Sequence, residues 1–141
     1  MPVGGKSPIR KRSVRALTCG LLVVMSLVLA GVAVAAVSGR TSQGLPISFG
    51  LSRGHLNNLK FAIKATCPSG RVWRVDASGF PGIKIVRSRF NQSFGSRKPS
   101  ARATVKGKVG AKKVTGSLTM KRFIAQEAHY CTGSATFTVR R

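Results

Sequence analysis

The residues best suited to acid–base chemistry are Asp76 and Glu127, because no other Asp or Glu occurs in the 141 residues. A glycosidase uses two such carboxyl groups, one as acid and the other as base or nucleophile, so a carbohydrate-active enzyme is one hypothesis. With 25 Lys and Arg residues in the chain, an ion pair with a neighbour such as Arg74 is the simpler role. The phosphate loop and the HExxH zinc motif are absent from the sequence, and we expect no enzyme, no catalytic residue, no metal and no cofactor.

The sulfur atoms suggest a second kind of chemistry. Cys19 falls in an N-terminal apolar run, which leaves Cys67 and Cys131 for the rest of the chain. In an oxidising compartment such a pair most simply forms a disulfide; this one would close a loop of about 65 residues and stabilise the fold by about 4 kcal/mol on the chain-entropy estimate. A metal held by both sulfurs and His129 lacks a fourth ligand and any CxxC spacing. A nucleophile formed from Glu127, His129 and Cys131 requires a free thiol.

Basic residues are the remaining candidates, because the formal net charge is +23. They alternate with apolar residues in two stretches, so a strand would turn them to one side of a sheet. Such a cationic face suits anionic polymers outside the cell, such as teichoic acid, lipopolysaccharide, acidic polysaccharide or released nucleic acid, held by salt-sensitive contacts. The alternative is that these charges only solvate the sheet and protect its edges. The candidate residues are Lys60, Lys64, Arg102, Lys106 and Lys108.

Aromatic side chains that could stack on bases or sugars are few, Trp73 and Tyr130 being those with a polar tip, so we expect no specific recognition of nucleic acid. The first functional hypothesis is therefore a non-enzymatic domain that associates with anionic surface polymer or with a partner protein. The second is a structural secreted β domain with no dedicated ligand. The sequence carries no signal for oligomeric state.

The elements that must position these residues are strands. Through most of the chain after residue 45, apolar and polar residues alternate with a period of two, and turn residues separate the runs. We therefore predict an all-β fold for 45–141, a single antiparallel β-sandwich or partly closed barrel of seven or eight short strands, with the polar segment 36–44 leading into it. The expected strands are 46–51, 59–67, 72–75, 83–86, 89–94, 101–109, 114–120 and 131–139.

The N-terminal residues 1–35 have the pattern of a secretory signal peptide. A basic stretch ends at Arg15, an apolar run follows, and small residues then offer a cleavage site between Ala35 and Ala36. The alternative is an uncleaved anchor, a hydrophobic helix over 16–37, since roughly 20 residues cross a bilayer. In both cases the basic flank stays in the cytoplasm. The β domain is then secreted or lies in the cell envelope, and only an uncleaved leader would contact the membrane.

The chain after the leader resembles a group of exported bacterial proteins built as small β domains. The resemblance implies the fold and the export, and it carries over no functional residues. Its features are Pro46-Ile47-Ser48-Phe49, Phe61-Ala62-Ile63 leading to Cys67, Val105-Lys106-Gly107, Val114-Thr115-Gly116-Ser117-Leu118 and the final stretch from Cys131 to Arg140.

Cleavage and the disulfide are both tested by intact mass spectrometry of the protein recovered from its native compartment. We expect a chain that begins at or near Ala36, with Cys67 and Cys131 alkylated only after reduction. A full-length mass that partitions with membranes would contradict cleavage. Alkylation without reduction would contradict the disulfide.

Overall fold

The computed structural model describes residues 34–97 and 100–141. The greater part of the expected leader, with Cys19 and the start of the hydrophobic helix, lies outside these residues.

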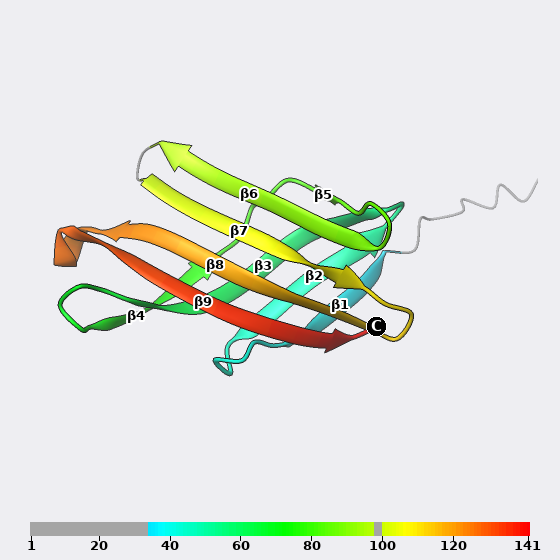
Figure 1. Cartoon of the computed structure of the whole chain (residues 1–141), viewed down its shortest axis with the longest axis horizontal. Coiled ribbons are helices and arrows are strands. Elements are labelled where there is room, and N and C mark those ends of the chain that lie inside the picture. Colours follow the sequence, from blue (N-terminus) through cyan, green and yellow to red (C-terminus); the bar gives the residue numbers. More distant parts are fainter. Residues whose placement is uncertain (1–33, 98–99) are drawn as a thin grey trace, which may run out of the picture. The chain divides into compact units, whose positions relative to one another are not determined.

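The described part of the chain is all-β, as predicted, and forms one antiparallel sheet in the order β1-β2-β3-β9-β8-β7-β6, with β4 and β5 both paired to β3 (Figure 1). Its elements are β1 (Ala35–Arg40), β2 (Pro46–Ser52), β3 (His55–Thr66), β4 (Val72–Ala77), β5 (Ile83–Lys84), β6 (Arg89–Arg97), β7 (Ser100–Val109), β8 (Lys113–Ile124), the 3-10 turn η1 (Ala125–Glu127) and β9 (His129–Arg140).

The expected count of seven or eight strands was too low, because the described residues form nine and β1 was missed. The segment 36–44, expected as a polar lead-in, holds most of this strand, which pairs with β2 from Ala35↔Leu51 to Arg40↔Pro46. Val37 is 3% exposed and belongs to the core. Alanine, valine and serine alternate here with little contrast in polarity, so the run looks like the end of the leader.

Alternation explains how the other strands are buried. In β3 the side chains of Phe61, Ile63 and Ala65 are buried, while Lys60 and Lys64 are exposed. The strands β7, β8 and β9 follow the same rule, since each has apolar residues on the inner face and charged or hydroxyl residues on the outer face. The inner faces together form one hydrophobic core.

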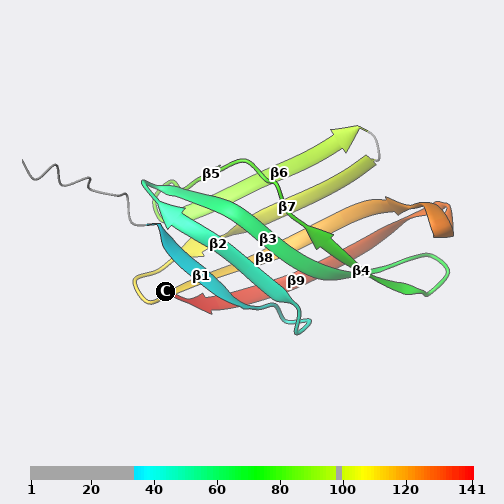
Figure 2. The ribbon, with the colours of Figure 1, turned by 180° about the vertical axis from the view of Figure 1, so that it is seen from behind.

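The sheet bends so that its two halves face each other. Figure 1 shows β6–β9 in front of β1–β3, and the view from behind in Figure 2 reverses the order. Across the interior, Phe49 of β2 meets Phe137 of β9 edge to face, with ring centroids 6.2 Å apart. The sheet is not closed, because β6 pairs only with β7 among the strands of the sheet.

The two halves join along a seam between β3 and β9. Backbone pairing between these two strands is limited to Thr66↔Thr132. Hydrogen bonds from the side chain of Gln43 add to this pairing. The Gln43 amide donates to the carbonyl oxygens of Lys64 (3.3 Å) and Ser134 (3.0 Å), and its own oxygen accepts from the Lys64 N–H (2.7 Å). Gln43 thus supplies hydrogen bonds that a full ladder would have made.

Two glycines make room for aromatic rings at the other end of the core. Gly107 of β7 and Gly116 of β8 lie opposite each other. A Cβ atom on Gly116 would meet the Phe137 ring and the Lys106 carbonyl oxygen, each at 2.5 Å, and one on Gly107 would meet the Phe90 ring at 2.6 Å. Glycine is required at both positions because the rings occupy the side-chain space.

We expect Gly116→Ala to lower the free energy of unfolding by about 1–3 kcal/mol, the usual effect of overpacking. Urea denaturation of the oxidised protein measures it. Gly95→Ala is the matched control, because its new methyl group would meet only the Ala101 carbonyl oxygen, at an ordinary 3.7 Å. Equal losses in the two variants would contradict the packing explanation.

Candidate functional site

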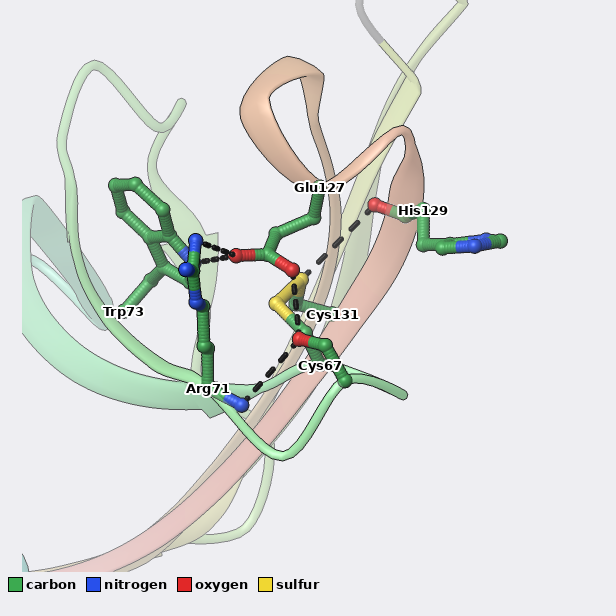
Figure 3. Close-up of a disulfide and its surroundings, with 7 residues drawn as sticks. Cys67, Arg71, Trp73, Glu127, His129 and Cys131 are labelled. Atoms are coloured by element: carbon green, nitrogen blue, oxygen red, sulfur yellow. Dashed lines mark hydrogen bonds and ion pairs between the residues drawn. A yellow bond between two sulfur atoms is a disulfide. The ribbon is translucent and has the colours of Figure 1, made fainter.

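The predicted disulfide between Cys67 and Cys131 is present. Cys67 directly follows β3, Cys131 is the third residue of β9, and their Cα atoms are 4.2 Å apart. Neither sulfur is then available as a thiolate, and the His129 ring points away from the bridge (Figure 3). In the described residues no group of three His, Cys, Asp or Glu could hold a metal ion.

Beside the disulfide, Glu127 joins η1 to the β3–β4 turn (Figure 3). Its carboxylate accepts hydrogen bonds from Ser69 Oγ (2.6 Å) and Trp73 Nε1 (3.0 Å) and pairs with the Arg71 guanidinium at 3.5 Å. Its side chain is only 5% exposed. This cluster and the disulfide therefore fasten the same two turns together.

The electrostatics of the two carboxylates do not favour a catalytic pair. The hydrogen bonds from Ser69 and Trp73, helped by the charge of Arg71, lower the pKa of Glu127, although burial acts in the opposite direction. A general acid requires a raised pKa. Asp76 pairs with Arg74 on the surface, at 3.0 Å, which is the role expected from the sequence.

The expectation that the sequence has no G-x-S-x-G motif was wrong, because residues 50–54, Gly-Leu-Ser-Arg-Gly, have this spacing, which is found in some hydrolases. In those enzymes the serine occupies a strand-to-helix turn. Here the segment runs into the β2–β3 hairpin, and Ser52 Oγ accepts a hydrogen bond from the Asn57 amide at 2.8 Å. The structural context of a nucleophile is therefore missing.

The outer side of β6–β9 carries many positive charges, and we call it the cationic face. These four strands contain no Asp or Glu, and most of their outward residues are cations or carry hydroxyl groups. The exposed cations of the cationic face are Arg89, Arg102, Lys106, Lys108, Lys113, Lys121 and Arg140.

Six of these cations stand directly opposite one another in three cross-strand pairs. The registers are Arg89↔Lys108, Arg102↔Lys121 and Lys113↔Arg140. Directly opposite side chains in an antiparallel pair have Cβ atoms about 4.5–5.5 Å apart, and like charges at that distance are destabilising. The face therefore holds a local concentration of unneutralised positive charge.

Two shallow depressions mark the cationic face. The first, of about 580 Å³, brings together Lys64, Arg102 and Lys121 from three strands, with hydroxyl groups around them. The second, of about 730 Å³, is lined by the cations Lys84, Arg89, Lys106 and Lys108. The two carboxylates, Asp76 and Glu127, line neither depression.

The structure thus distributes the five predicted cations. Arg102, Lys106 and Lys108 share β7, and Lys64 joins Arg102 because the β3–β9 seam places it at the edge of the face. Lys60 lies apart, opposite Ser48 of β2 and near Asp76.

Four cations of the cationic face were not predicted from the sequence: Arg89, Lys113, Lys121 and Arg140. Lys121 continues the outward series of β8, so the alternation could have revealed it. The pairing of each with another cation depends on strand register, which the pattern of one strand does not contain.

These features define the class of protein as a disulfide-tied, all-β domain with a cationic outer face. Comparisons with protein-family models, curated proteins and solved structures found no match. Within the described residues, the helical structure includes nothing long and apolar enough to cross a membrane.

The Glu127 cluster predicts a pH-dependent stability. Because the pKa of Glu127 is lowered from its ordinary value of 4.5, its contribution is complete above about pH 4.5 and is lost as the pH falls through the folded-state pKa. We expect Glu127→Gln to lower the free energy of unfolding at pH 7 and to have a smaller effect at pH 3, measured by urea denaturation.

Asp76→Asn is the control, because an exposed ion pair contributes only about 0–1 kcal/mol. An effect of Glu127→Gln that is the same at both pH values would show that shape, and not charge, holds the two turns together.

Proposed function

We propose that the chain is an exported, non-enzymatic domain that binds anionic cell-surface polymer through the cationic face. The observation that carries this proposal is the set of three opposed cation pairs on strands without a carboxylate. A surface that only needed solvation would be more stable with opposite charges across the strands. A bound polyanion would offset the repulsion.

The chemistry of the depressions suits oxyanions. In the first depression, Lys64, Arg102 and Lys121 supply charge, and hydroxyl groups of Thr and Ser supply further donors. Both depressions adjoin β7 and lie on the same side of the sheet. A linear polymer crossing β7 would meet cations from both.

Export is part of the same proposal. The disulfide is typical of an oxidising compartment, and the signal-peptide pattern and the resemblance to exported bacterial β domains agree with it. We interpret the bent sheet, open beside β6, as a partly closed barrel that presents its outer side to the cell envelope. Cleavage after residue 35 or retention as an anchor would both leave the domain outside.

The other two hypotheses have less support. A structural domain without a ligand does not account for the opposed cations. A carbohydrate-active enzyme would use Asp76 and Glu127, yet each of these carboxylates has its own arginine partner, and the pKa of Glu127 moves away from that of a general acid. We therefore do not propose either.

We expect dextran sulfate to bind and neutral dextran not to bind, with affinity falling steeply as salt is added. Arg102→Thr should reduce the slope of log K against log salt by about one and weaken binding roughly fivefold, which corresponds to about 1 kcal/mol per cation. The same substitution should stabilise the free protein by about 0.2–1 kcal/mol, because it relieves an opposed pair. Binding is measured by titration calorimetry and stability by urea denaturation.

Lys60→Thr is the matched control, because it removes one exposed strand cation outside the cationic face. We expect little change in affinity and no gain in stability. An equal loss of affinity in both variants would mean that total charge, and not the face, determines binding.

A further inference from the structure

The inner side of the sheet contains a hollow that the proposed polymer binding does not use. Along β7 the inward residues change from Val105, which is fully buried, to Ala103 and Ala101 near the start of the strand. These small side chains leave a hollow of about 730 Å³ between β6–β8 and the connection from β4 to β5. Ligand pockets commonly have volumes of 300–1,000 Å³.

The walls of this hollow combine an aromatic, apolar part with polar groups, and they are only partly covered. Phe80, in the β4–β5 connection, stacks on Phe61 with ring centroids 5.5 Å apart. Its ring also contacts that of Phe94 of β6, with centroids 4.8 Å apart. Phe80 and Phe94 are half-buried and line the hollow together with Met120. In the sheet, β6 pairs only with β7, so its other edge is open. The contact between Phe80 and Phe94 crosses this open edge.

One cation belongs to the same hollow. Arg122 of β8 lies opposite Ala101 and Cys131, so it shares the inner face with the buried disulfide. The ion pairs of the described residues are Arg71–Glu127 and Arg74–Asp76, and neither includes Arg122. Asp76 also lines the hollow, but Arg74 already neutralises it.

From this combination we infer that the hollow binds an anionic amphiphile, a single acyl chain with an acidic head group. The chain would lie against Phe80, Phe94 and Met120, and the head group would pair with Arg122. An acyl chain is driven against aromatic walls by the hydrophobic effect, whereas a charged polymer is held mainly by its ion pairs. The inner site is therefore chemically distinct from the cationic face.

The inference is tested by titrating the oxidised protein with monomeric oleate and, in parallel, with oleyl alcohol, which has the same chain without the charge. We expect oleate to bind at one site and oleyl alcohol to bind at least tenfold more weakly. Arg122→Gln should weaken oleate binding about tenfold, and Lys60→Gln, which removes an exposed cation elsewhere, should leave it unchanged. Ala101→Phe, which fills the hollow, should reduce binding of both ligands.

Dextran sulfate binding of the same variants separates this inference from the proposed function. Arg122→Gln and Ala101→Phe should bind the polymer like the unmodified protein, and urea denaturation shows that both variants are folded. A protein that binds dextran sulfate but not oleate overturns the inner site alone, and the reverse overturns the proposed function alone. Equal affinity for oleate and oleyl alcohol, or equal losses in Arg122→Gln and Lys60→Gln, would also overturn the inner site.

Discussion

The seam between β3 and β9 is the constraint on which the rest of the structure depends. The ladder between β3 and β9 has one backbone pair, and an isolated bridge between Thr41 and Phe137 also links the two halves. Three side-chain interactions reinforce this junction: the Gln43 amide, the Cys67–Cys131 bridge and the Glu127 cluster. A chain with such a high net charge resists compaction. It is therefore significant that the covalent link and one of the two carboxylates lie at this junction.

The seam also relates the fold to its surface chemistry. It makes the outward side of β3 continuous with that of β9, so Lys64 and Thr66 line a depression together with residues of β7–β9. On the inner side, the same bend encloses the core and leaves a hollow where β7 has only alanines. One sheet thus has a hydrated cationic side and an apolar inner side with a single arginine at its margin.

The sequence allowed the all-β class, the disulfide and most strands to be predicted, because alternation and cysteine pairing are local or nearly local signals. Strand β1 was missed because Ala35–Val37 resemble the end of a leader. The opposed cations depend on register across β6, β7, β8 and β9. Hairpin geometry and core packing fix that register, so it could not be read from one strand at a time.

The early start of β1 gives the sheet residues that the proposed leader would also use. An anchor over 16–37 would need Ala35, Ala36 and Val37 in a helix, whereas the sheet uses them as an extended strand with Val37 in the core. A peptidase acting between Ala35 and Ala36 would likewise need this stretch before it pairs with β2. Cleavage at this point, which we propose, would have to precede completion of the sheet edge, because folding of β1 would withdraw these residues from a peptidase.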